Sequence, residues 1–449
     1  MANSPRAFLV GLYEEYLAEA SFLYAQRLSL LDDPKIAWNE RGEFEERLEA
    51  HIDGLVVGGQ LALEVCGRQA AEGDFGELYA AACVFCRQNR QDLVLEILDQ
   101  LDGEDAEKTS AVAGALKQEL PEAWCPDFLT LLAGGNPKLA PVLARAFGYR
   151  RVPCGPQLLA ALRRCAAAAV PELVWALGRI AYSPAAEVLL DYLRSEEEPV
   201  RAAAAVALAR IGEPGMIDRC LAEMHSHTWP LVPLGLAGGR SAWAALTELH
   251  RTNNSADCVI ALGLLGDAAS VPDLLRLLEQ AAPATPAALA LQAITGAGIS
   301  ETAFIPEEVN EDELFEAERA AFRRGQPPVR VDGRPFGSTV TRLSQKPEDW
   351  NRWWQTNATR FTPGVRYRNG GLFSPGRLIE MLTAERTPHQ LRRYCSEELA
   401  IRYQNDFGIE TDMPVSRQVN RLAEAVTWSQ ADSTRFQEGE WYFAGHRCA

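Results

Sequence analysis

Apolar residues recur at helical spacing along most of the 449-residue chain. Between residues 7 and 31, Leu9, Tyr16 and Leu23 fall on one face of a helix, and acidic side chains fall on the other. This pattern predicts a long amphipathic helix. The same periodicity predicts further helices, separated by short breaks, at about 43–52, 60–70, 75–88, 90–101, 105–119 and 121–133.

A short phrase of alanine and leucine with a small final residue recurs along the middle of the chain. The copies end 33, 31, 27, 27 and 32 residues apart. A helical repeat of about 30 residues is typical of an α-solenoid, in which helix pairs stack because none can bury its apolar face alone. The clearest copies are Ala176–Ala181, Ala207–Gly212 and Ala261–Gly266, and weaker ones are Leu143–Gly148, Leu234–Gly239 and Ala293–Gly298.

The best-preserved repeat indicates where its helices begin and end. Ser195 precedes Glu198 by three residues, which is the spacing of a capping box. Gly212 supplies the C-terminal stop, and a second helix with buried Met216 and Cys220 follows. We expect the second helices of such pairs to line a concave face, which would offer an extended acidic groove.

The repeat pattern stops near residue 300. Acidic residues crowd 301–318, and a helix is predicted over 311–322. Adjacent prolines and two glycines predict a loop or short strands over 327–347, and the step Asn369-Gly370 favours a hairpin over 361–375. Further helices are predicted at 347–359, 375–384, 388–404 and 416–430, where a final helix pair would close the array.

These changes in sequence pattern divide the chain into parts. Such a division is expected, because the chain is too long to form one compact core. The predicted fold is all-α, a solenoid of antiparallel helix pairs with a small Trp-rich C-terminal module that contains a β-hairpin. The predicted parts are a helical cap (1–59), a repeat array (60–300), an acidic segment and linker (301–346) and a Trp/Arg-rich helical module (347–449).

The charge of the chain is strongly and unevenly negative. The formal net charge is −17, with −22 in residues 1–322 and +5 in residues 323–449. Binding to nucleic acid needs an excess of cations, so a general nucleic-acid binder is not expected. The arginine excess of the last part fits a solvated surface as well as it fits a binding patch.

Cysteine usage and hydropathy indicate the compartment. The ten cysteines lie at irregular intervals, several inside helical patterns, as free thiols do in a reducing environment. Glu14, Glu15 and Glu19 interrupt the first apolar stretch, which does not fit a secretory signal. No apolar run is long enough to span a membrane. We therefore expect a cytoplasmic protein.

Two resemblances rest on these motifs. The Ala-Leu-x-x-Ile-Gly endings over about 60–300 resemble HEAT repeats, in the short form also seen in bilin-lyase-like proteins. The whole chain resembles an uncharacterised proteobacterial HEAT-repeat family often encoded beside type VI secretion genes. That resemblance implies no catalytic residue; it implies an accessory role in handling secretion cargo or spike proteins. The matching stretches are Tyr13–Glu15, Glu19–Leu23, His51–Leu55, Gly58–Gly59, Trp350–Trp354 and Arg366–Gly370.

The sequence contains no pattern that marks a catalytic or metal site. Cys83 and Cys86 form a CxxC inside a helical pattern without a second pair, so two buried cysteines are favoured over a metal or redox centre. His225 and His227 stand two residues apart, and histidines at that spacing do not share a helix face. We predict no catalytic residue, no metal ligand and no cofactor.

The best candidate for contact with a partner is the segment that combines tryptophan, tyrosine and arginine, residue types that dominate binding hot spots. The alternative is that the tryptophans form the core of a module packed on the end of the solenoid. The candidate partner-binding residues are Trp350, Trp353, Trp354, Arg366, Tyr367 and Arg368.

Repeats without catalytic motifs favour a non-catalytic scaffold, adaptor or chaperone-like protein. Its partner would be another protein with a basic or amphipathic surface, such as a secretion effector or spike protein, and no membrane is expected to be involved. The competing hypothesis is an enzyme built on HEAT-like repeats, similar to a bilin lyase or a nucleic-acid glycosylase. A desolvated carboxylate beside a tryptophan in a concave cleft would favour that enzyme.

Overall fold

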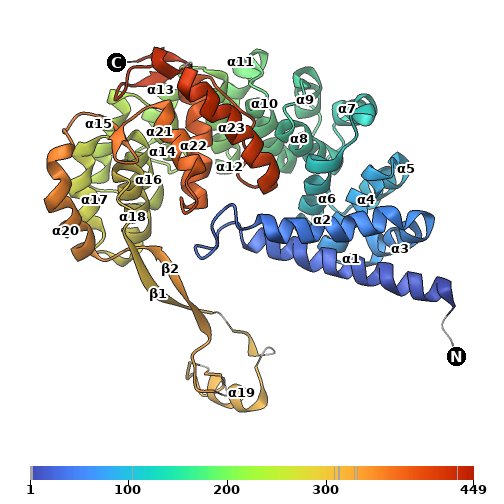
Figure 1. The fold of residues 1–449 in the computed structure, drawn as a ribbon. Helices are drawn as coiled ribbons and strands as arrows, with labels where there is room; N and C mark the ends of the chain where they lie inside the picture. Colours follow the sequence, from blue (N-terminus) through green and yellow to red (C-terminus); the bar gives the residue numbers. More distant parts are fainter. Residues whose placement is uncertain are drawn as a thin grey trace.

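The computed structural model of the chain describes residues 4–103, 105–307, 309–311, 314–327, 329–330, 332–431 and 433–448. It is an all-α solenoid: antiparallel helices stack into a curved array, and one continuous hydrophobic core runs along most of it (Figure 1). The predicted fold class is thus confirmed. No helix in the described part of the chain is both long and apolar enough to cross a bilayer.

Two rows of helices build the array, and alternate helices belong to alternate rows. The inner row is α4 (Phe75–Arg87), α6 (Ala106–Glu119), α8 (Leu139–Tyr149), α10 (Val170–Arg179), α12 (Glu198–Ile211), α14 (Leu231–Ala237), α16 (Ala256–Leu265) and α18 (Ala281–Thr295). The outer row is α3 (Gly59–Glu72), α5 (Gln91–Gln100), α7 (Cys125–Gly134), α9 (Gly155–Leu162), α11 (Ala186–Tyr192), α13 (Gly215–Glu223), α15 (Arg240–His250) and α17 (Val271–Leu277).

The helices that carry the repeated phrase are those of the inner row. They face the C-terminal segment: α12 and α14 pack against helix α22 (His389–Tyr403). The prediction that the second helices of the pairs line the concave face is therefore wrong. The physical reason is the size of the side chains. The glycines and alanines of the phrase let neighbouring inner helices approach each other closely. The inner row therefore packs more tightly than the outer row.

Glycine positions on the inner row show this close approach directly. A Cβ atom on Gly178 would lie 2.6 Å from the Cα atom of Ala207 in the next inner helix. Gly263 stands in the same relation to Ala290, also at 2.6 Å. Real Cβ atoms do not come so close, so these contacts between neighbouring repeats require glycine.

Left-handed caps end several of these helices where the phrase predicts a stop. Gly212 has φ +88° and Gly266 has φ +77°, and Ala181 adopts the same region at φ +47°. Helix α18, in contrast, ends at Gly296 and not at Gly298, and α8 continues through Tyr149, one residue beyond the expected end. The glycine of the phrase is thus a cap in some repeats and a packing residue in others.

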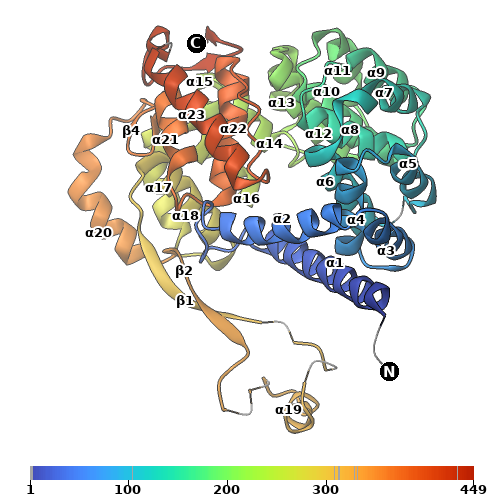
Figure 2. The same cartoon turned by 45° about the vertical axis from the view of Figure 1, so that its right-hand side comes forward.

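A helix pair precedes the array and reaches across to its far end. Helices α1 (Pro5–Ser29) and α2 (Gly42–Val57) pack on α3 and α4. The loop between them contacts the C-terminal module, where His389 Nδ1 lies 2.8 Å from Asp32 Oδ1 and the backbone N–H of Trp38 donates to Glu385. Figure 2 shows this pair spanning the open side of the curve.

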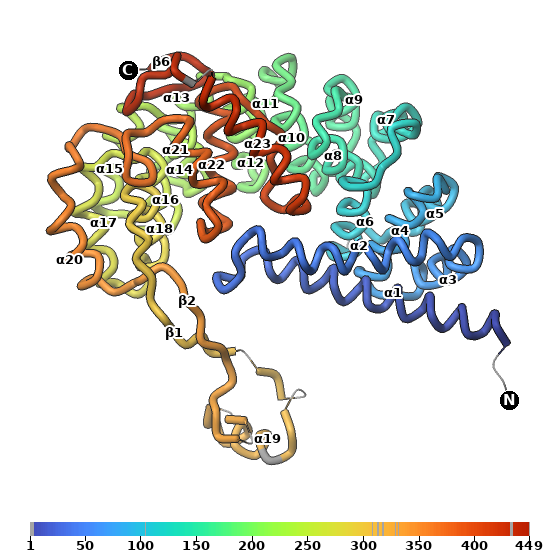
Figure 3. The backbone as a smooth tube through the Cα atoms, in the orientation of Figure 1, coloured from blue at the N-terminus to red at the C-terminus, as the bar shows by residue number. Residues whose placement is uncertain are grey.

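The segment predicted as an acidic linker forms a protruding arm. Strand β1 (Ser300–Pro306) pairs antiparallel with β2 (Gly337–Leu343), from Ser300 opposite Leu343 to Pro306 opposite Gly337. The expected helix over 311–322 is shorter, because α19 covers Glu316–Phe322; Asp312 and Glu313 lie outside the described residues. Figure 3 shows the arm pointing away from the array.

The C-terminal module does not extend the array. Its helix α22 turns back and packs on α12 and α14 of the inner row, so the expected closing helix pair is wrong. The predicted hairpin at Asn369-Gly370 is confirmed. The module comprises α20 (Pro347–Asn357), β3 (Tyr367–Arg368), β4 (Gly371–Leu372), α21 (Pro375–Thr383), α22 (His389–Tyr403), α23 (Val415–Ala431), β5 (Tyr442–Phe443) and β6 (His446–Arg447).

Candidate functional site

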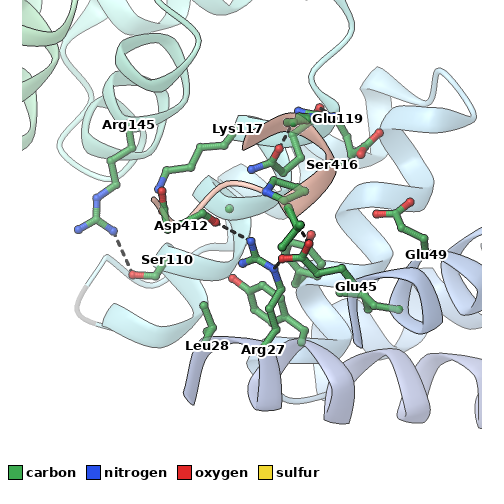
Figure 4. Close-up of a pocket in the computed structure, with 18 of the residues that line it drawn as sticks. Arg27, Leu28, Glu45, Glu49, Ser110, Lys117, Glu119, Arg145, Asp412 and Ser416 are labelled. Carbon is green, nitrogen blue, oxygen red and sulfur yellow. Dashed lines mark hydrogen bonds and ion pairs between the residues drawn. The ribbon is translucent and has the colours of Figure 1, made fainter. Parts of the chain in front are cut away.

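A large cavity of about 1220 Å³ lies on the inner face of the N-terminal half of the array. Helices α1 and α2 form one wall, the inner helices from α4 to α12 form the other, and the segment before α23 closes one end. Figure 4 shows charged side chains from all three directions converging on this cavity. We call it the inner cavity.

The floor of the inner cavity is a buried ion pair that ties the N-terminal helices to the C-terminal segment. Arg27 Nε donates to Glu45 Oε1 at 2.8 Å, and the other oxygen of Glu45 accepts the backbone N–H of Val415 at 2.6 Å. Arg27 also donates to the carbonyl of Asp412 at 2.5 Å. Figure 4 shows Arg27 and Glu45 side by side at this point. The floor is thereby fixed by hydrogen bonds from three elements.

The carboxylate of Asp412 is held by cations of the array. Lys117 Nζ lies 3.3 Å from Asp412 Oδ2. Burial by itself would raise the pKa of Asp412, but the charges of Lys117 and Arg27 outweigh it and lower that pKa. Asp412 is therefore an anion at neutral pH, and its role here is structural.

The walls carry further cations, each paired with carboxylates. Arg87 lies 2.6 Å from Glu49 and 2.9 Å from Asp53, and Arg145 lies 2.7 Å from Glu172. The inner cavity is thus mixed in charge and not uniformly acidic. Its rim on α2 is the acidic part, because the side chain of Asp53 is 68% exposed and that of Glu49 is 46% exposed.

Apolar side chains stand on both walls of the inner cavity. Trp175 is half-buried on α10, beside Pro171, and Leu28 is exposed on α1 across the cavity. The guanidinium of Arg179 stacks on the Trp175 ring at 5.0 Å from its centroid. A rigid tryptophan beside charged groups is the composition of a binding hot spot.

The remainder of the inner face is not an open groove, because the C-terminal segment covers it. Glu397 of α22 lies between Arg179 and Arg210, at 2.6 and 2.9 Å. Asp406 pairs with Arg151 at 2.8 Å and also with Arg210. The expected acidic groove along the whole array is therefore wrong: arginines of the inner row bind carboxylates of the chain itself.

These pairs shift the pKa of the carboxyl groups. Burial opposes ionisation, but the charges of Arg179 and Arg210 lower the pKa of Glu397 to about 2. The pKa of Asp406 is lowered in the same way, against burial, by Arg210 and Arg151. Both groups are ionised at any physiological pH.

The residues predicted to contact a partner gather at the end of the array, but most are buried. Trp350 is 1% exposed, and its Nε1 donates to the carbonyl of Ser344 at 2.7 Å. Tyr367 is buried, and Phe361 lies between it and the half-buried Trp353 and Trp354. Only these last two tryptophans offer surface to a partner, so partner contact stays a prediction limited to them.

The two arginines of the predicted set lie in the interior. Arg366 is 0% exposed and stacks on Phe373 and Trp441, and its Nε donates to the carbonyl of Leu265 at 2.6 Å. Arg368 is 1% exposed and lies 2.7 Å from Glu398. Part of the arginine excess of the C-terminal part is thus buried in the core of the module.

The other motifs that the sequence singled out hold no cluster of ligands. Burial raises the pKa of Cys86 to about 12 and that of Cys83 well above the ordinary thiol value, which disfavours the reactive thiolate. His225 and His227 are exposed at a helix end, and His227 lies 3.5 Å from Glu223. Among the described residues, no group of three or more His, Cys, Asp and Glu side chains is placed to hold a metal ion.

A carboxylate does lie one helical turn from a tryptophan in the inner cavity, as the enzyme hypothesis required. Glu172 precedes Trp175 on α10, but its carboxylate pairs with Arg145 at 2.7 Å. A carboxylate neutralised in this way is not the desolvated general acid that a glycosidic reaction needs. The geometry at Glu172 therefore does not favour a glycosidic reaction at this carboxylate.

Sequence reasoning missed most of the inner cavity, because its residues come from distant parts of the chain. One signal was present for the neighbouring part of the inner face, which α22 covers. Arg179 and Arg210 occupy the same place in two copies of the repeated phrase, and both face inward to carboxylates. A charged residue at a constant place in an apolar repeat indicates a buried partner elsewhere in the chain.

Comparison with known proteins agrees with this architecture. The stacked helix pairs define an α-solenoid, and residues 155–224, which span α9 to α13, match the model of the HEAT-repeat family. No curated protein and no solved structure matches the chain.

Proposed function

We propose that this protein is a non-catalytic scaffold or adaptor that binds a segment of another protein in the inner cavity. HEAT repeats commonly serve as scaffolds for protein interaction, which supports this class of function. The observation that carries the proposal is the inner cavity itself, about 1220 Å³ in volume, with an apolar side chain on each wall and acidic groups on its rim.

The chemistry of the cavity favours a basic, amphipathic partner segment. Apolar side chains of the segment would pack against Trp175 and Leu28. Its cations would pair with the exposed Glu46 and with the solvent-facing sides of Asp53 and Glu49, which also bind Arg87. The net charge of −17 adds long-range attraction that speeds encounter and weakens with salt.

The setting we propose is type VI secretion, with an effector or spike protein as partner. This rests on the resemblance in Tyr13–Glu15, His51–Leu55 and Trp350–Trp354. A cytoplasmic location follows from the same proposal, because cargo is prepared for secretion inside the cell.

Site-specific crosslinking in the native host tests the proposal. A photoreactive residue at Ser110, which is exposed at the cavity, should crosslink a host protein, and one at Asp191 on outer helix α11 should not. The crosslink should weaken as salt increases. Identification of the captured protein by mass spectrometry then tests the secretion setting separately.

Matched tryptophan variants identify the contact. Trp175→Ala should weaken binding of the captured partner by about tenfold or more, since hot-spot truncation costs about 2 kcal/mol. Trp243→Ala, at an equally half-buried tryptophan on outer helix α15, should leave it unchanged. Equal crosslinking from Ser110 and Asp191, or equal effects of both tryptophan variants, would refute binding in the inner cavity.

A further inference from the structure

A second cavity, of about 580 Å³, lies where the loop between α1 and α2 meets the C-terminal module and the base of the arm. Figures 1 and 2 show this loop beside the module. Helix α18, the start of β1, the end of β2 and the turn before α22 complete its walls. None of its lining residues also lines the inner cavity. We call this separate space the side cavity.

Most buried arginines of the chain lie next to a carboxylate. Of the eight arginines that are buried in the described part of the chain, five pair with a buried glutamate. The exceptions are Arg41, Arg366 and Arg392. Arg366 stacks on two aromatic rings. Arg41 lines the side cavity, and Arg392 stacks on Trp38, which also lines it. The side cavity thus has two buried cations at one wall, without a counter-ion among the described residues.

Arg41 has an unpaired donor at this wall. It is 1% exposed, and its Nε donates to the carbonyl of Trp38 at 3.1 Å and its Nη2 to the carbonyl of Thr411 at 3.3 Å. Its Nη1 is buried and has no hydrogen-bond partner among the described residues. A buried charged donor without a partner is unfavourable. Because the bond to Thr411 is long, the guanidinium can turn toward a ligand at little cost.

Arg392 is in the same state beside Arg41. It is 0% exposed, and it donates to the carbonyl of Leu382 at 3.0 Å and to Gln418 Oε1 at 2.8 Å. Its Nη1 also has no partner in the described part of the chain. Burial, and then the charge of Arg41, lower the pKa of Arg392 to about 9, so it is still a cation at neutral pH. An anion at this wall would reduce the repulsion between the two guanidinium groups.

Trp38 adds a third unpaired donor to this wall. The guanidinium of Arg392 stacks on its ring, 4.1 Å from the centroid, and its buried Nε1 has no partner among the residues described. Helix α22, which is 15 residues long, begins at the side cavity with no acidic residue in its first turn. The positive end of the helix dipole adds to the attraction for an anion.

The donors and the charges at the side cavity favour a carboxylate over a phosphate. The N–H groups on Arg41 Nη1 and Trp38 Nε1 suit the two oxygens of a carboxylate and are too few for a phosphate group. The carboxylates of Asp32, Asp33 and Glu385 also line the cavity, and they repel a doubly charged group more than a singly charged one. An anion with a single charge therefore fits this wall.

We propose that the side cavity binds a small organic monocarboxylate. Its carboxylate lies against Arg41 and Trp38, near the charge of Arg392. Its apolar chain packs on Ile36 and Leu343, which line the same cavity. The bound molecule joins the loop between α1 and α2 to the C-terminal module. This inference is independent of the proposed function, which concerns the inner cavity.

Binding of sodium hexanoate to the full-length protein, measured by saturation-transfer NMR at constant ionic strength, tests the proposal. Hexanoate should bind about tenfold or more tighter than hexanamide, which has the same chain without the charge. Arg41→Met, which keeps an apolar side chain at the wall, should weaken hexanoate binding about tenfold or more. The matched control Arg393→Met changes the exposed arginine next to Arg392 on α22, and it should leave binding unchanged.

A second variant separates loss of the site from misfolding. Trp38→Phe keeps an aromatic ring for Arg392 and removes the Nε1–H donor, so it should weaken hexanoate binding about fivefold, the usual effect of one hydrogen bond. A wild-type protein that does not bind hexanoate overturns the proposal. So does binding that Arg41→Met and Trp38→Phe both leave unchanged, because the molecule then lies elsewhere. Displacement of hexanoate by inorganic phosphate at a lower concentration than by acetate overturns the choice of a carboxylate.

Discussion

At the scale of single residues, ion pairs with almost no exposure hold the C-terminal module on the array. Glu398 is 0% exposed and binds Arg368 at 2.7 Å and Arg402 at 3.1 Å. Arg402 in turn donates to the carbonyls of Gly235 and Gly238 at the end of α14. The carboxylate of Glu398 thus balances the charge of two buried arginines, and these arginines in turn contact the repeat helices.

Removal of that carboxylate leaves two guanidinium groups buried without a counter-ion. Glu398→Ala should lower the free energy of unfolding by about 3–5 kcal/mol, the usual cost of breaking a buried pair. Glu424→Ala removes an exposed partner of Arg421 and should cost at most about 1 kcal/mol. Urea unfolding followed by circular dichroism measures both. Equal midpoints for the two variants would contradict the structural role of Glu398.

Stability should fall at low pH because of Glu397. Its pKa is about 2 in the folded chain, below the unfolded value of about 4.3. A lowered pKa in the folded state gives stability that is complete above the unfolded value and is lost as the pH falls towards the folded value. The unfolding midpoint of the wild type should therefore decrease from about pH 5 to pH 2. Glu397→Gln should be less stable at neutral pH, with a flatter decrease; an equally steep decrease would contradict this assignment.

At the scale of elements, the spacing of neighbouring inner helices depends on glycine. Gly178→Ala places a methyl group against the backbone of Ala207, so α10 and α12 must separate. We expect a loss of about 1–3 kcal/mol, typical of overpacking. Gly67→Ala is the control: it lies inside α3 with nothing within 4 Å of its Cβ position. That substitution should stabilise by about 0.5–1 kcal/mol. Differential scanning calorimetry should give melting shifts of opposite sign.

The elements that could be predicted from the sequence are those that nearby residues determine. Helix periodicity, left-handed caps at Gly212 and Gly266 and the Asn369-Gly370 turn depend on nearby residues, and all are present. The capping box of Ser195 is absent, because Glu198 instead accepts the backbone N–H of Trp229 in the next repeat. Strand β1 was missed, since its partner lies more than thirty residues away and its own pattern is short.

At the scale of the whole molecule, the inner cavity exists because distant charges meet. Arg27 and Asp412 are 385 residues apart in sequence, and no local pattern connects them. The same holds for Arg210 and Glu397, which are 187 residues apart. The repeat predicts the curved array, but the segment that covers its inner face is fixed only by such pairs, so the candidate site could not be predicted.

Closure of the molecule across the inner cavity depends on Glu45, which binds Arg27 and the backbone of Val415. Without it, the N-terminal helix pair should open away from the start of α23. In the absence of a partner, Glu45→Ala should increase hydrogen exchange of the Val415 amide region and of α2 by about tenfold or more, which corresponds to 1.4 kcal/mol of lost protection. Exchange in α12 and α14, which α22 covers, should not change.

The neighbouring residue provides the control for this closure. Glu46 is exposed at the rim, on the same helix and next to Glu45 in sequence. Glu46→Ala should leave exchange at Val415 and α2 at the wild-type rate while it weakens binding of a basic partner segment. The two variants separate the carboxylate that holds the cavity together from the one that faces its ligand. Equal exchange in both variants would mean that packing on α3 and α4 holds α1 and α2 in place. The ion pair of Glu45 with Arg27 would then not be needed to keep the inner cavity closed.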